Sequence, residues 1–392
     1  MTDLAIYFKP VQGYAGPVFR NLPGKRLGEI VSIYSEEAVF PSLESIDLAI
    51  IGIDEDRNAV MNEGCSLAAD AIRPYLYKLF PGDYDLKITD LGNIRRGNTP
   101  EDTYFAVSTL ISFLIRNKVT PIIIGGGQDL TYAAYQAYKD MDRIINLTVI
   151  DNLLDIGETE GPLNSRSYMS HIILHKPNYL FNYANIGYQS CLVDRGALDL
   201  MRELYFDTCR LGIAQSNIQD LEPILRNADM VSFDISAIRQ SDAPGNANAS
   251  PNGFYGEQAC QLAYYAGLSN KLSCMGFFEM NPSFDTAGQT AQLLAQMIWY
   301  FIDGYYHRQK DNPQDDPDSF IRYNVQLPNQ NDGILFYKSK LTDRWWMEVK
   351  CPDNQKEKFR DHFIVPCSYT DYQIACTNEI PDRWWQAYQK LM

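Results

Sequence analysis

The chain has 392 residues, of which 45% are hydrophobic and 21% charged, a balance typical of a folded globular protein rather than a disordered one. Its formal charge of −15 argues against an extended nucleic-acid surface, because phosphate contacts need clustered Lys and Arg. No apolar run reaches the length of a membrane span and the first residues lack a signal-peptide pattern, so we expect neither a membrane span nor export.

The cysteines and histidines limit the kinds of disulfide and metal site that the chain can form. The eight cysteines are scattered without a C-x-x-C pair, which favours reduced thiols and a cytoplasmic protein. Only four histidines are present, a count that excludes a His-rich metal centre.

Apolar strands alternate with amphipathic helices from about residue 48 to residue 305. Strands are predicted over 46–53, 119–125, 145–151, 228–235 and 272–280. Helices are predicted over 64–80, 103–117, 131–141, 195–206, 254–269 and 290–306. Continuous apolar strands separated by helices indicate an α/β fold: three αβα layers around a mostly parallel central sheet.

A polar, proline-bearing stretch follows this alternating region and marks a boundary. We expect an N-terminal extension over 1–45, the α/β domain over 46–308, a linker over 309–319 and an appended C-terminal module over 320–392. Four of the five tryptophans lie in the module, in two copies of "DRWW" at 343–346 and 382–385. Packing in the module's core is the favoured role for both pairs, and an exposed pair would instead anchor a protein partner.

Polar residues gather where the predicted strands end. The glycine turn "GGGQDL" carries Gln128 at the carboxyl edge of the sheet, where α/β proteins keep their sites. Side chains two apart on extended backbone share a side, which groups the following residues: Asp151, Leu153 and Asp155; Asp234 and Ser236; Glu279 and Asn281. Converging carboxylates need a cation, a proton or an Arg or Lys partner. The alternative is that each Asp only caps the helix after its strand.

The order of these motifs resembles the ureohydrolases: arginase, agmatinase and formimidoylglutamase. The motifs are "IGGG-x-D", "D-x-x-x-D", "S-x-D" followed by "DAPG", and "E-x-N-P-x-x-D". The likeness covers about residues 45 to 308 and implies an arginase-like fold. The "GGGxD" form and "NSRSYM" at 164–169 place the chain nearest the formimidoylglutamase branch.

The resemblance implies a dinuclear site that this sequence does not reproduce. The family carries two manganese ions that share a hydroxide, held by four aspartates and two histidines. Gln128 and Leu153 stand at the histidine positions and Ser236 at the last aspartate, while Asp151, Asp155 and Asp234 match. Amide, aliphatic and hydroxyl groups remove the charge and imidazole that grip such metals. No cofactor is therefore expected, the alternative being a single divalent cation, Mn or Mg, held weakly by the three aspartates.

The substrate side of the resemblance is better preserved. Glu279 matches the family glutamate that faces the substrate's cationic amidine group, and Asn281, Ser165 and Arg166 are further pocket candidates. Arg166, or Arg239, is one candidate for inserting a guanidinium among the carboxylates in place of the lost metals. The alternative is that both arginines point to solvent.

Three functions follow from these observations. The first is a non-catalytic relative with a binding, scaffold or regulatory role. The second is an active hydrolase of an amidine or formimino C–N bond that uses one metal or a rebuilt site. The third is an assembly component that acts through residues 320–392. Family members usually form closed homo-oligomers, which we also expect here.

Overall fold

The computed structural model describes residues 4–12, 25–83, 85–157, 161–327 and 333–392. Its main sheet has ten strands in the order β1-β4-β3-β5-β10-β9-β6-β7-β8, with β2 paired to β4. Apart from the antiparallel β1–β4 pair, the pairings in this sheet are parallel. The strands are β1 (Phe8–Lys9), β2 (Ser32–Ile33), β3 (Leu48–Ile53), β4 (Ile88–Ile94), β5 (Thr120–Ile124), β6 (Ile145–Ile150), β7 (Leu180–Tyr188), β8 (Asp207–Arg210), β9 (Met230–Asp234) and β10 (Cys274–Phe278).

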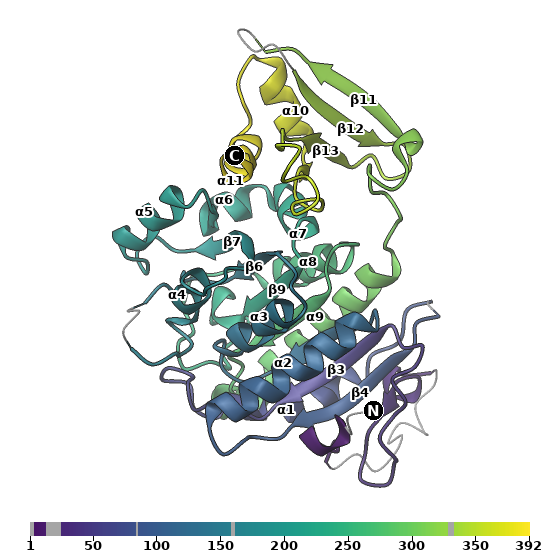
Figure 1. The fold of residues 1–392 in the computed structure, drawn as a ribbon. Coiled ribbons are helices and arrows are strands. Elements are labelled where there is room, and N and C mark those ends of the chain that lie inside the picture. The colour runs from purple at the N-terminus through teal and green to yellow at the C-terminus, as the bar shows by residue number, and fades with distance from the viewer. Residues whose placement is uncertain (1–3, 13–24, 84, 158–160, 328–332) are drawn as a thin grey trace.

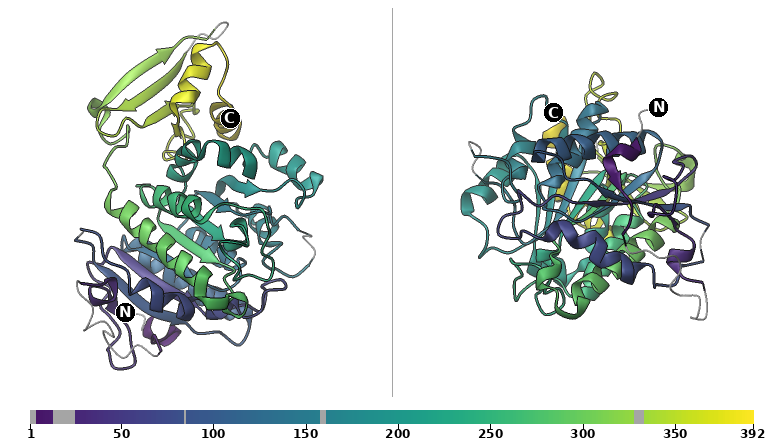
Figure 2. Two further views of the ribbon diagram at one scale, coloured as in Figure 1. Left: turned by 180° about the vertical axis from the view of Figure 1, so that it is seen from behind. Right: turned by 90° about the horizontal axis from the view of Figure 1, so that it is seen from below.

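Helices cover both faces of this sheet (Figures 1 and 2), which confirms the predicted three-layer α/β fold. One core cluster packs the sheet against α1 (Ala68–Leu76), α6 (Leu211–Ser216), α7 (Glu222–Arg226), α8 (Gly256–Gly267) and α9 (Gln289–Tyr306). The other packs it against α2 (Pro100–Arg116), α3 (Leu130–Asp140), α4 (Tyr168–Ile173) and α5 (Arg195–Glu203). In β3, Ile50 faces the first cluster and Ile51 the second, so the strand is buried on both sides.

Two central strands, β4 and β7, were missed because polar side chains interrupt their apolar runs. In β4, Asp90 is fully buried and accepts hydrogen bonds from the Arg73 guanidinium at 2.9 and 3.0 Å. This bidentate pair compensates the burial of both charges. The edge of the sheet also includes residues 8–9 and 32–33, which pair with β4. Part of the predicted N-terminal extension is therefore built into the main sheet.

The chain beyond α9 forms a separate antiparallel sheet in the order β11-β12-β13-β14, shown above the main body in Figure 1. Its strands are β11 (Phe320–Val325), β12 (Ile334–Ser339), β13 (Trp345–Glu348) and β14 (Ile364–Cys367), followed by α10 (Tyr369–Cys376) and α11 (Asp382–Leu391). Trp345, Trp346 and Trp384 are buried in or against this module, whereas Trp385 is 44% exposed. Packing thus accounts for three of the four DRWW tryptophans.

The module contacts the α/β domain through buried hydrogen bonds and aromatic rings. The Arg226 guanidinium lies 4.2 Å from the centre of the Trp346 ring and donates to the Trp345 and Cys367 carbonyls. At a second point, the His362 ring stacks on Phe181 with the ring centres 4.3 Å apart. The contact therefore combines aromatic stacking with charge-assisted hydrogen bonds.

Two further sequence expectations concern the cysteines and membrane-spanning helices. All eight cysteines are free thiols. Within the described part of the chain, no helix combines the length and the apolar character that a bilayer span requires.

The buried His362 generates a pH prediction. Burial, followed by the nearby Lys271, holds the pKa of His362 well below its usual value. The unfolded chain takes up a proton below about pH 6.5 that the folded chain rejects, so stability falls on acidification by up to about 1.4 kcal/mol per pH unit. We expect His362→Phe, which retains an aromatic ring against Phe181, to flatten this loss in urea unfolding between pH 7.5 and pH 5. Equal losses in both proteins would contradict this assignment.

Candidate functional site

The loops after β5, β10, β9 and β6 meet at one edge, because these four strands are neighbours in the sheet. The first loop is a glycine turn, with Gly125 and Gly126 at φ 87° and 78°. A Cβ on Gly126 would lie 2.3 Å from a Leu130 side-chain carbon and 2.5 Å from the Glu55 carbonyl oxygen. Only glycine fits there, and the tight turn carries Gln128 to the edge of the sheet.

The Gln128 side chain lies between three carboxyl groups and is 1% exposed. The amide orientation that pairs every donor with an acceptor directs its nitrogen at them. That nitrogen is 3.0 Å from an oxygen of Asp151, 3.0 Å from one of Asp155 and 3.2 Å from one of Asp234. The residue at the first predicted ligand position therefore supplies N–H donors where the family pattern has a metal-binding imidazole.

Two hydroxyl groups fix the other end of this amide. In the same orientation, the Gln128 oxygen accepts from Ser232 Oγ and from the Tyr168 hydroxyl, both at 3.3 Å. Thr131 Oγ1 lies 2.7 Å from Ser232 Oγ and extends the network. Sequence reasoning did not assign Ser232 or Tyr168 a role. Ser232 could have been found, since it lies two residues before Asp234 on β9 and shares its side.

Asp151 and Asp155 lie together in the loop after β6, although the backbone there is not extended as their spacing assumed, since Asp155 has φ 51°. The two carboxyl groups share a hydrogen bond, and the Leu153 backbone N–H donates to Asp151 at 3.0 Å. The Leu153 side chain lines the cavity beside them but offers no polar atom. The middle residue of the motif thus contributes only its backbone to the cluster.

Asp234 has a local bond as well as its place in the cluster. It caps the short 3-10 helix Ile235–Ala237, since its carboxylate accepts from the Ser236 backbone N–H at 2.7 Å. The Ser236 hydroxyl donates to Asp151 at 3.4 Å. Asp234 therefore both caps the 3-10 helix that follows its strand and belongs to the group of converging carboxyls, two roles that the sequence left as alternatives.

Burial dominates the ionisation of these acids. It raises the pKa of Asp155 to about 7, and together with repulsion from neighbouring carboxylates it raises the pKa of Asp151 and Asp234 well above the usual range. Burial and mutual repulsion both favour the neutral form of a carboxyl group. The cluster thus combines acids of raised pKa with amide and hydroxyl donors.

Glu279 lies next to this cluster with both oxygens already engaged. One oxygen accepts from the Gln128 backbone N–H at 2.8 Å and the other from the Asn62 side chain at 2.7 Å. Asn281 is fully buried and donates to Asn62 at 3.2 Å and to the Glu63 carbonyl at 2.8 Å. Its contacts position Asn62 rather than facing the cavity. Sequence reasoning assigned Asn62 no role, although it lies close before α1 in the chain.

These residues border a cavity of about 240 Å³, here called the acidic cavity. It is lined by Leu153, Asp155, Ser165, Asp234, Ser236 and Glu279, together with several asparagines. Arg166 is exposed at its rim, where it donates to the Asn248 side chain at 2.8 Å. Arg239 pairs instead with Asp242 at 2.8 Å. Neither arginine is inserted among the carboxylates, where the Gln128 amide lies instead, so the alternative that both lie outside the cluster is the one that agrees with these contacts.

The segment that builds this site matches a known family. The model described as "Arginase family" matches residues 46–303, which include every loop of the acidic cavity. The chain belongs to the arginase family. The match ends within α9, so the module from β11 to α11 lies outside it.

Curated relatives of this arginase-family chain include bacterial formimidoylglutamases. The enzyme of Staphylococcus haemolyticus is 25% identical over 281 residues, which cover 67% of this chain and 90% of the relative. That of Staphylococcus aureus is 26% identical over 270 residues, covering 65% and 85% respectively. The resemblance to the formimidoylglutamase branch is thereby confirmed.

Solved structures support the same fold. The formiminoglutamase of Trypanosoma cruzi, solved with Mn²⁺, superposes with a TM-score of 0.65 at 19% identity, covering 73% of this chain and all of that one. The formimidoylglutamase of Bacillus subtilis gives a TM-score of 0.67 at 16% identity, covering 75% and 96%. At these identities the likeness establishes the arginase-like fold alone.

The hydrogen bonds of Gln128 predict its effect on stability. Gln128→Leu keeps the bulk of the side chain but removes the amide N–H donors that face the three carboxyls, leaving buried oxygens without those partners. We expect the free energy of unfolding to fall by about 1–3 kcal/mol, measured by urea denaturation. The matched control is Gln296→Leu on the exposed face of α9, expected within about 0.5 kcal/mol of wild type. Equal effects of the two substitutions would show that Gln128 does not bridge the cluster.

Proposed function

We propose that this arginase-family protein is a non-catalytic member of the family that binds a small ligand in the acidic cavity. The observation that carries this proposal is the position of the Gln128 amide nitrogen, within 3.0–3.2 Å of Asp151, Asp155 and Asp234. A side chain of the protein thus occupies the point on which the retained carboxylates converge.

The donor set does not fit a pair of manganese ions. Leu153 has no donor atom, Ser236 offers a neutral hydroxyl already directed at Asp151, and Gln128 offers an amide in place of an imidazole. Two divalent cations need several anionic or imidazole ligands to offset the loss of their hydration. The three remaining carboxyls supply too little charge for two such ions.

The charges around the acidic cavity support a particular class of ligand. Asp155, Asp234 and Glu279 lie along its wall and Arg166 at its rim. A cationic amidine-type group would meet the carboxylates, while a carboxylate at the other end of the ligand would meet the Arg166 guanidinium. The cavity volume, about 240 Å³, suits a molecule of amino-acid size. We therefore propose a linear amidino or formimino amino acid as the ligand class.

A second candidate function is hydrolysis supported by a single metal ion. It is favoured by the convergence of three carboxylate oxygens on one point, the present position of the Gln128 nitrogen. If the Gln128 side chain rotates away, one Mn²⁺ or Mg²⁺ could take that point, since hard cations prefer such oxygen ligands. The metal content of the protein separates this candidate from the first.

The test restores the family's ligands. The variant Gln128→His/Leu153→His/Ser236→Asp is expected to bind two Mn²⁺ per chain, while the wild type binds none at the same metal concentration. Because a ligand that binds only the folded state stabilises it, Mn²⁺ at about 100 times the dissociation constant should stabilise the variant by about 2.7 kcal/mol for each occupied site. Metal content after gel filtration and thermal unfolding with and without Mn²⁺ provide the two measurements.

Activity measurements complete this test. Release of ammonia or urea from arginine, agmatine and formimidoylglutamate should be absent in the wild type with Mn²⁺. One bound ion per wild-type chain with chelator-sensitive turnover would establish the second candidate instead. Two bound ions per wild-type chain would overturn the argument from the ligand positions altogether.

A further inference from the structure

A second cavity, of about 680 Å³, lies at the opposite edge of the main sheet, between the α/β domain and the C-terminal module. It is bordered by Thr120 at the start of β5, by Ser273 just before β10 and by Trp346 and Pro366 of the module. We call it the junction cavity. It shares no lining residue with the acidic cavity and has the volume of an ordinary ligand site.

Basic side chains dominate its lining, although the whole chain carries a formal charge of −15. Six cationic residues line the junction cavity: Lys118, Arg143, Arg226, Lys271, Arg308 and Lys310. They face three carboxylates, those of Asp311, Asp315 and Asp361. Of these three, Asp311 is buried and already accepts from the Thr342 hydroxyl at 2.5 Å. The lining therefore carries a surplus of positive charge.

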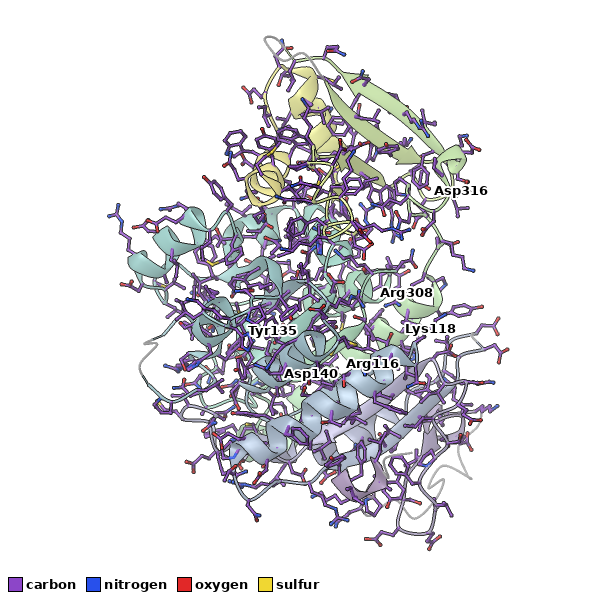
Figure 3. All side chains as sticks on the ribbon, viewed as in Figure 1. Arg116, Lys118, Tyr135, Asp140, Arg308 and Asp316 are labelled. Atoms are coloured by element: carbon purple, nitrogen blue, oxygen red, sulfur yellow. The ribbon has the colours of Figure 1, made fainter. Side chains whose placement is uncertain are left out.

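Several of these cations have no carboxylate partner. Within the described ranges, Lys118, Arg308 and Lys310 form no ion pair; Lys118 and Lys310 are exposed. Arg308 is half-buried over the Tyr305 ring and donates only to the Gly267 and Leu272 carbonyls, at 2.8 and 3.1 Å. Figure 3 labels Lys118 and Arg308 in the region below the module.

Arg226 is a second, independent observation, because it carries a buried hydrogen-bond donor without an acceptor. This guanidinium is 6% exposed, and its Nη1 atom has no hydrogen-bond partner among the described residues. Its Nε lies 3.1 Å from a Glu222 oxygen that also lies 3.2 Å from Arg344, so one carboxylate serves two arginines. A buried, unpaired guanidinium donor is costly unless an anion meets it.

The remaining two cations share one carboxylate in the same way. Arg143 lies 2.7 Å and Lys271 3.3 Å from the two oxygens of the buried Asp229. Arg143, Arg226 and Lys271 thus have carboxylate partners, whereas Lys118, Arg308 and Lys310 have none among the described residues. An added anion would supply the missing partner.

We propose that the junction cavity is a binding site for a small organic phosphate. Guanidinium groups match phosphate oxygens in a planar, two-pronged geometry, and ammonium groups add point charges. A phosphate group carries nearly two negative charges, so one or two such groups balance the unpaired Lys118, Arg308 and Lys310. The cations that would meet the anion all come from residues 118–310, while the module covers the cavity with Trp346 and Pro366.

Inorganic pyrophosphate serves as the probe, added to the full-length protein at low ionic strength and followed by calorimetry and thermal unfolding. We expect one site per chain, an increased melting temperature and an affinity that falls with added salt. Arg308→Gln should weaken binding by about tenfold or more, because it removes a guanidinium from the cavity. Lys118→Gln, on an exposed side chain, should weaken binding without affecting folding.

Two controls make the result specific. Arg202→Gln removes one positive charge from α5, away from the junction cavity, and should leave the affinity unchanged. Gln128→Leu alters the other edge of the sheet and should also leave it unchanged. Absence of binding at millimolar pyrophosphate, or equal weakening by Arg202→Gln and Lys118→Gln, would overturn the proposal. Binding that survives Gln128→Leu separates this site from the acidic cavity.

Discussion

The site of this protein depends on one interaction, the contact of the Gln128 amide with three buried carboxyls. Carboxylates brought together at the end of a parallel sheet repel each other. A cation, a hydrogen-bond donor or protonation of one of the groups reduces this repulsion. The amide supplies donors without charge, and the hydroxyls of Ser232 and Tyr168 hold it in the orientation that does so. Burial raises the pKa of Asp155 to about 7, which lowers the charge that these donors must offset.

The sequence predicted the main strands and helices because the α/β domain follows the simplest rule, apolar strands alternating with amphipathic helices. It failed at β4 and β7, where Asp90 and Asn185 are buried only because Arg73 and the Leu153 carbonyl pair with them. The grouping of Asp151 with Asp155 and of Asp234 with Ser236 assumed extended backbone, but Asp155 has φ 51° and Ser236 lies in a 3-10 helix. Each pair is nevertheless brought together, through the loops that follow β6 and β9. The role of Gln128 could not be predicted, because it depends on how the amide is oriented among residues of β9, of the loop after β6 and of α4. The position of Arg166 stayed open for a related reason: a sequence shows that a side chain is charged but not how much space is available for it.

The two edges of the main sheet have opposite electrostatic character. At the carboxyl ends of β9 and β10, Asp234 and Glu279 border a small acidic cavity. At the amino ends of the same strands, Arg226 and Lys271 border a larger basic one. The first cavity is lined entirely by the segment that matches the arginase family, whereas the lining of the second includes residues of the appended module. The basic side chains at the second edge come from residues 118–310, and the module covers them to form a cavity.

The packing of Arg226 has a consequence for the α/β domain taken by itself. In the intact protein its guanidinium lies over Trp346 and donates to two carbonyls of the module, and Phe181 is likewise covered by His362. A chain shortened to the matched family segment would uncover both side chains at once. It would then expose a charged group on α7 and an aromatic ring on β7 that the intact protein keeps buried. At this surface the α/β domain is therefore not a self-contained unit.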